Sequence, residues 1–105
     1  MKHTLVIPAE KAIIKLGDDI RDARRRRNIT MALLAERAGI NVITLSKIEK
    51  GDPGTSIGGY ASVLFSLGMI NRLRDIADAS HDLTGQMLAK EQLPKRVRIK
   101  KTGKI

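Results

Sequence analysis

The side chains in this sequence that could carry chemistry are mostly cations, and they gather in two places. The 105 residues contain 20 Lys and Arg against 11 Asp and Glu, which gives a net charge of +9. Positions 24–27 are four consecutive arginines, and the last eleven positions hold six cations and no acid. Clustered positive charge favours a polyanionic partner, most simply nucleic acid, although such a tail can also serve solubility alone. The cations of the tail are Lys95, Arg96, Arg98, Lys100, Lys101 and Lys104.

Residues suited to catalysis or metal binding are few and poorly placed. The chain has no cysteine, which excludes disulfides, zinc–thiolate sites and cysteine nucleophiles. His3 and His81 lie in regions without metal-binding partners. No serine has a recognisable base, and Gly58-Gly59 lacks the lysine and strand context of a phosphate-binding loop. We therefore expect no enzyme activity, no catalytic residue, no metal and no cofactor.

The apolar stretches of the chain are short. The longest lie within residues 63–70, far below the length of a membrane span. An apolar patch at residues 5–7 is followed by Glu10 and Lys11, unlike a secretory signal. Together with the absence of cysteine, this favours a cytoplasmic protein with no membrane partner.

Six amphipathic segments, separated by helix caps and glycines, predict an all-α fold. Thr30, Asn41 and Ser56 are good N-cap residues, and glycine follows three of the segments. The first helix could be divided by Gly17, which would place the two aspartates after it at a positive helix start. The fifth is expected to bury Leu73, Ile76 and Ala77. The predicted helices are residues 9–27, 31–38, 42–50, 57–67, 71–79 and 83–93, the last ended by Pro94, with a possible short strand at Val97 and Ile99.

Residues 29–51 contain the arrangement that points to a function. Two short predicted helices are joined by a turn in which Gly39 tolerates a positive φ, and the small Ala35 lets them cross closely. Leu45 and Ile48 anchor the second helix, which leaves its other face exposed. This is the geometry that places a helix in the major groove of DNA, with a generic pair of bundle helices as the plain alternative.

This pattern resembles the Cro/C1-type helix-turn-helix proteins, the XRE family, over residues 16–67. The resemblance implies a five-helix lambda-repressor-like domain, here with a basic C-terminal extension, that dimerises and binds operator DNA. We expect an N-terminal extension at residues 1–15, the helix-turn-helix domain at 16–79, and the extension with its basic tail at 80–105. The matching residues are Ile29-Thr30, Leu34-Ala35, Ala38-Gly39-Ile40 and the run from Thr44 to Gly51.

A narrower resemblance extends further along the chain, to the HipB-type antitoxins. Those proteins pair with a HipA-type serine/threonine kinase toxin and repress their own operon. The resemblance implies a repressor that also neutralises such a toxin, with a stand-alone XRE-family regulator as the alternative. It rests on residues 51–54, 63–68 and 73–77, on Asp82, and on residues 93–98.

The XRE resemblance assigns Val42, Ile43, Ser46 and Lys47 to the surface that faces the bases. Lys47 can donate hydrogen bonds to O6 and N7 of guanine. Val42 and Ile43 cannot hydrogen-bond a base edge and could pack only on thymine methyl groups, where many family members carry a polar pair. Readout could therefore depend on DNA shape, or one of the two could be a core or dimer residue.

The same resemblance assigns Thr30, Met31, Thr44 and Lys50 to phosphate contacts. A glutamine is usual at the position of Met31, so backbone N–H groups at the start of that helix would have to bind the phosphate instead. The basic tail could add phosphate contacts, or it could contact protein.

Arg24 and Glu49 match a pair that bridges the first and third helices in related phage repressors. The resemblance therefore implies that the main role of Arg24 is structural, in this ion pair, rather than in contact with DNA. Positions 25–27 cannot all face one way on a helix, so at least one of these arginines is expected to be only solvated.

Overall fold

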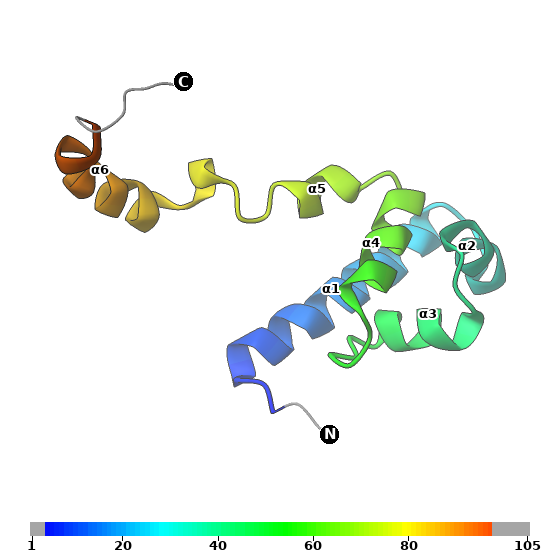
Figure 1. Ribbon diagram of the computed structural model, residues 1–105. Helices are drawn as coiled ribbons and strands as arrows, with labels where there is room; N and C mark the ends of the chain where they lie inside the picture. Colours follow the sequence, from blue (N-terminus) through cyan, green and yellow to red (C-terminus); the bar gives the residue numbers. More distant parts are fainter. Residues whose placement is uncertain (1–3, 98–105) are drawn as a thin grey trace. The chain divides into compact units, whose positions relative to one another are not determined.

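The computed structural model describes residues 4–97, and every regular element in that range is helical (Figure 1). The all-α prediction is confirmed for these residues. The chain divides into two units, one ending at Leu73 and the other beginning at Arg74. The elements are α1 (Ile7–Arg26), α2 (Met31–Ala38), α3 (Val42–Glu49), α4 (Ile57–Ser66), α5 (Ile70–Arg74), the 3-10 helix η1 (Ala79–His81) and α6 (Leu83–Val97).

The helices of the first unit start where short-range hydrogen bonds satisfy their backbone groups. Thr30, Asn41 and Ser56 each accept a hydrogen bond from the backbone N–H three residues further on, at 3.1, 2.7 and 3.2 Å. These caps depend only on neighbouring residues, so they can be recognised in the sequence. Accordingly α2 has its predicted bounds, and α3 and α4 each end one residue earlier than predicted.

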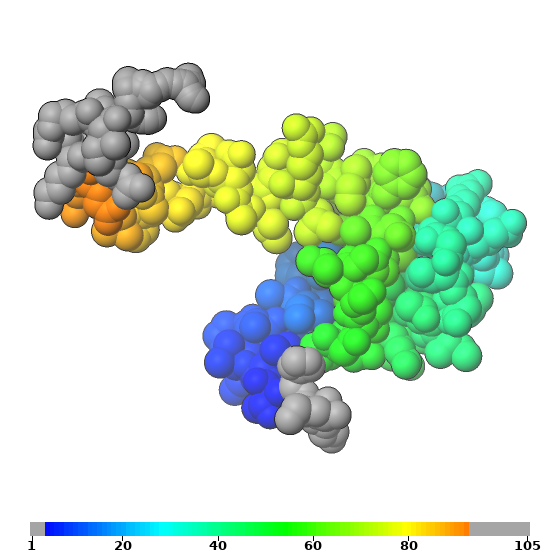
Figure 2. Space-filling view, in the orientation of Figure 1, coloured from blue at the N-terminus to red at the C-terminus, as the bar shows by residue number. Residues whose placement is uncertain are grey.

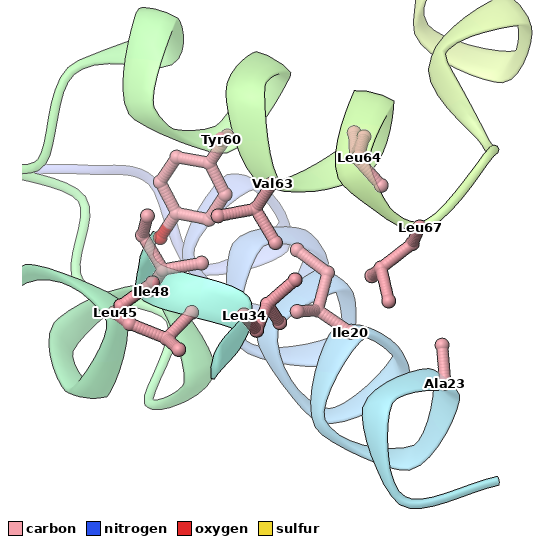
Figure 3. Packing of buried hydrophobic residues seen from close by; sticks show 10 residues of the cluster. Ile20, Ala23, Leu34, Leu45, Ile48, Tyr60, Val63, Leu64 and Leu67 are labelled. Atoms are coloured by element: carbon pink, nitrogen blue, oxygen red, sulfur yellow. The ribbon is translucent and has the colours of Figure 1, made fainter. Parts of the chain in front are cut away.

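The core of the first unit lies where α1, α2, α3 and α4 meet (Figure 3). In the space-filling view, atoms of α4 lie directly against those of α2 (Figure 2). The Tyr60 hydroxyl donates to the carbonyl oxygen of Asp52 at 2.9 Å, which ties α4 to the turn that follows α3. Burial raises the pKa of Tyr60, so this donor keeps its proton. The buried residues are Ile20, Ala23, Leu34, Ala35, Leu45, Ile48, Tyr60, Val63, Leu64 and Leu67.

α1 runs through Gly17 without a break, so the possible division there does not occur. Gly17 is buried, and a Cβ at this position would lie 2.5 Å from the carbonyl oxygen of Ile48 and 2.7 Å from the nitrogen of Gly51. The glycine therefore allows α1 to pack closely against the end of α3. The aspartates that follow it lie inside the helix and pair with neighbouring cations: Asp18 with Arg21 at 2.8 Å, and Asp19 with Lys15 at 2.6 Å.

The chain after α4 departs most from the predictions. α5 ends at Arg74 rather than at residue 79, and Asp78 starts a new turn by accepting a hydrogen bond from Ser80 N at 2.9 Å. Leu73 is half-buried and packs against the core, as predicted, but Ile76 is 71% exposed and Ala77 is exposed as well. None of the side chains at residues 74–92 is buried.

α6 continues through Pro94 to Val97, so the predicted end at residue 93 is wrong. Proline removes one backbone donor, but a helix can continue past it with a local bend. Val97 thus belongs to a helix rather than to a strand. The rest of the possible strand and most of the basic tail, residues 98–105, lie outside the described residues.

Gly51 and Gly39 allow a test of the close contact between α1 and α3. Both have a positive φ, +75° and +71°, but an added Cβ would lie 2.5 Å from Cα of Ile14 at Gly51 and would meet nothing within 4 Å at Gly39. Gly39→Ala should lower the free energy of unfolding by about 1–2 kcal/mol, from backbone strain alone. Gly51→Ala should cost clearly more or prevent folding, because strain and steric overlap add. Urea denaturation followed by circular dichroism compares the two variants, and equal losses would contradict the contact.

Candidate nucleic-acid interface

A tight turn centred on Gly39 joins α2 to α3. Gly39 has φ 71° and ψ 28°, in the left-handed region, and the N–H of Ile40 donates to the carbonyl oxygen of Ala35 at 3.0 Å. Ala35 is buried and has no side-chain atom beyond Cβ, so α3 can cross α2 closely. The two helices and their turn therefore have the helix-turn-helix arrangement.

The outer face of α3 carries the four side chains predicted to face the bases. Ile43 is 70% exposed and Val42 is 44% exposed, Lys47 is exposed and Ser46 is half-buried. Neither Val42 nor Ile43 belongs to the core, which removes the core interpretation of this apolar pair. The inner face of α3 is fully buried by contrast. α3 is thus held from one side, with the predicted reading surface on the other.

The four residues predicted to face phosphates differ in what they can offer. The hydroxyl oxygen of Thr30 accepts the N-cap hydrogen bond, which leaves its O–H as a donor. Lys50 is exposed at the C-cap of α3, and Thr44 is half-buried. Met31 packs against the core, so any phosphate contact at this position falls to the backbone N–H groups at the start of α2.

Arg24 and Glu49 join α1 to the end of α3 by a bidentate ion pair. Nε of Arg24 donates to Oε2 of Glu49 at 2.7 Å, and Nη2 donates to Oε1 at 3.2 Å. Nη1 donates to the carbonyl oxygen of Ile29 at 3.1 Å, just before α2. The side chains are 11% and 5% exposed, respectively. The hydrogen bond to Glu49 raises the pKa of Arg24, which keeps the guanidinium charged. With all three of its nitrogens engaged, this guanidinium serves the fold.

Arg27 also serves the fold, a role that we did not predict from the sequence. Its Nη1 donates to the carbonyl oxygen of Ala23 at 2.9 Å, and its Nη2 donates to that of Leu67 at 3.0 Å. A cation near the C-terminus of a helix, here at the C-cap of α1, is a general signal for such bonds, but the partner Leu67, the C-cap of α4, lies 40 residues away. Arg25, Arg26 and Arg27 are all exposed, and Arg27 differs from the other two in that its guanidinium makes these two backbone hydrogen bonds.

Residues 4–97 contain no group of three His, Cys, Asp or Glu side chains that could hold a metal ion. In the same part of the chain, no helix combines the length and the apolar character needed to cross a bilayer. His81 lies exposed in η1, and His3 is outside the described residues.

Residues 20–58 match the model of the helix-turn-helix family. The match begins at Ile20 in α1 and ends in the first turn of α4, so it contains α2, the turn and α3 together. No curated protein and no solved structure matches the chain. The family consists of DNA-binding regulators, and the matched segment is the one that the structure folds into a helix-turn-helix.

Replacement of Arg24 tests the structural role of the ion pair. Arg24→Ala leaves the Glu49 carboxylate buried without its partner and should lower the free energy of unfolding by about 3–5 kcal/mol. The double replacement Arg24→Met with Glu49→Leu should cost less, because it removes both charges. Arg25→Ala, at the exposed neighbouring position, is the control and should change stability by no more than about 0.5 kcal/mol. Thermal and urea unfolding measure all three. An unchanged melting temperature for Arg24→Ala combined with weaker DNA binding would assign Arg24 to the DNA contact instead.

Proposed function

We propose that this protein is a sequence-specific DNA-binding transcriptional repressor that acts in the cytoplasm on operator DNA and is not an enzyme. The observation that carries this proposal is the division of α3 into a buried inner face and an exposed outer face. α3 is also the second helix of a helix-turn-helix, the element that enters the major groove in such motifs. The match of residues 20–58 to the helix-turn-helix family supports the same function.

In this proposal the outer face of α3 meets the base edges. Lys47 is the main polar reader, since its ammonium group can donate to O6 and N7 of guanine. Ser46 is half-buried beside it and lies at the edge of the groove. Val42 and Ile43, one turn of α3 before Ser46 and Lys47, place apolar side chains against the bases.

Contacts to phosphates would fix the position of α3 in the groove without specifying sequence. Thr30, Thr44 and Lys50 supply side-chain donors, and the start of α2 at Met31 supplies backbone N–H groups. Thr30 and Asn41 cap α2 and α3, so the first turns of both helices are held in place before DNA arrives.

We further propose that the protein binds as a homodimer. α3 has eight residues, which span about 12 Å of groove and so cover only about three to four base pairs. So short a reading surface specifies too little sequence by itself. Two copies would read two half-sites on one face of the DNA, about 34–36 Å apart.

A second role, as the antitoxin of a HipA-type kinase, is favoured by the unit that begins at Arg74. This unit exposes large apolar side chains, and no side chain at residues 74–92 is buried. Contact with a partner would remove this apolar surface from water, which is favourable. The resemblance to HipB-type antitoxins covers part of the same segment. The alternative is a stand-alone regulator in which these side chains meet a second copy of the chain. The exposed apolar residues are Ile76, Leu83, Met87 and Leu88.

Lys47→Ala and Lys50→Ala should separate base readout from phosphate binding. Loss of Lys47 should weaken binding to a selected operator by about 1–3 kcal/mol more than binding to a scrambled duplex. Loss of Lys50 should weaken binding to both duplexes equally and reduce the slope of affinity against salt. Fluorescence anisotropy at several salt concentrations measures both effects. Equal losses on both duplexes for Lys47→Ala would contradict its role as a reader.

Met87→Glu tests the partner surface of the second unit. If a HipA-type kinase is encoded beside this protein, coexpression of the wild-type chain should relieve the growth inhibition by that kinase, and Met87→Glu should not. Gln92→Glu places a carboxylate at an exposed polar position of the same helix and should leave the relief intact. The melting temperature of Met87→Glu should stay unchanged, because Met87 is exposed. Absence of a kinase gene next to this one would favour the stand-alone regulator.

A further inference from the structure

The first turn of α3 presents hydrocarbon where a DNA reader usually presents hydrogen-bonding groups. Val42 and Ile43 are consecutive, and both are exposed. Single exposed apolar residues are ordinary on protein surfaces. This pair differs because it lies at the leading end of the helix proposed to enter the groove, away from the buried inner face.

The polar side chains next to this pair are half-buried, except that of Asn41, which precedes α3, is exposed and retains its amide N–H groups as donors. Oδ1 of Asn41 accepts the N–H of Thr44 at 2.7 Å as the cap of α3. Thr44 itself is half-buried, and so is Ser46 in the next turn. At the two exposed positions of the first turn, side-chain hydrogen bonds to a base edge are therefore not possible.

The major groove offers one apolar feature to such a surface, the methyl group at C5 of thymine. The same methyl group occurs on 5-methylcytosine. Other base edges in the groove present hydrogen-bond donors and acceptors, which would lose water against hydrocarbon without gaining a partner. Val42 and Ile43 are thus suited to pack against a pyrimidine that carries a C5-methyl group. They disfavour a base edge that offers only hydrogen-bonding groups.

We propose that Val42 and Ile43 recognise the C5-methyl groups of pyrimidines in the major groove, so that the operator is selected partly by its methyl pattern. This inference rests on the proposed function and adds the chemical group that is read. Ile43 and Lys47 are four residues apart and lie on the same side of α3. The rise between them is about 6 Å, nearly two base-pair steps. A recognised methyl group should therefore lie within about two base pairs of the guanine that Lys47 contacts.

The experiment begins with selection of bound duplexes from a random double-stranded DNA library by the full-length protein. Each thymine of the selected duplex is then replaced singly by deoxyuridine, which removes only the methyl group. Affinity should fall about fourfold for each contacted methyl, the factor expected for burying one such group. At a sensitive position, duplexes with thymine, uracil, cytosine and 5-methylcytosine are compared. A gain from cytosine to 5-methylcytosine shows that either base can supply the methyl group, and a loss restricted to uracil identifies thymine as its source.

Two variants connect the methyl effect to the helix. Ile43→Ala should lower affinity for the thymine duplex and abolish the difference between thymine and uracil at one position. Ile7→Ala, the same substitution at an exposed position at the start of α1, should leave that difference intact. Circular dichroism should show both variants folded as the wild type.

The outcomes separate this inference from the function on which it rests. A selected duplex that binds tightly, with no effect of uracil at any position, overturns methyl recognition while leaving sequence-specific binding in place. Loss of affinity by Ile43→Ala on every duplex, with a change in molar mass by light scattering, also overturns it and assigns the pair to a contact between copies. If the library yields no preferred sequence, both the proposed function and this inference fail.

Discussion

The ion pair between Arg24 and Glu49 holds the end of α3 against α1. The Glu49 side chain is 5% exposed, and a charge buried to that degree is strongly destabilising without a partner. Arg24 supplies two hydrogen bonds to it and a third to the carbonyl of Ile29, so one guanidinium joins α1, the chain before α2 and the end of α3. The close approach of Gly17 and Gly51 occurs at the same junction. The placement of the proposed reading surface depends on this set of contacts.

Local signals made much of the helix-turn-helix predictable from the sequence. The caps at Thr30 and Asn41 and the left-handed Gly39 depend on residues within one turn, and the helix bounds follow from them. The role of Gly17 was missed because it depends on the backbone of Ile48, which only the folded chain brings near. The bond from Arg27 to Leu67 was missed for the same reason. In the second unit, Ile76 has the spacing of a buried residue, but no neighbouring element covers it.

The proposed interface combines two kinds of interaction, attraction between cations and phosphates and contacts between aliphatic side chains and methyl groups. In the proposed interface, exposed cations such as Arg25, Arg26 and Lys50 would attract any duplex, and salt would weaken that attraction. Contacts between methyl groups and aliphatic side chains carry no charge, so salt hardly affects them directly. Affinity and selectivity should therefore respond differently to ionic strength, with discrimination between sequences less sensitive to salt than binding itself.

The contacts that hold α3 in the fold lie in its last turn, whereas the side chains of its first turn are exposed. The ion pair, the glycine contact and the buried side chains all act from Leu45 onward, whereas Val42 and Ile43 contribute nothing to the core. Substitutions at these two positions therefore alter the fold's stability by no more than surface changes usually do, about 0.5 kcal/mol. The residues that maintain the fold are thus separate from those that we propose to read the DNA. With DNA reading as proposed, a duplicated copy of the gene could change its target sequence without first losing its fold.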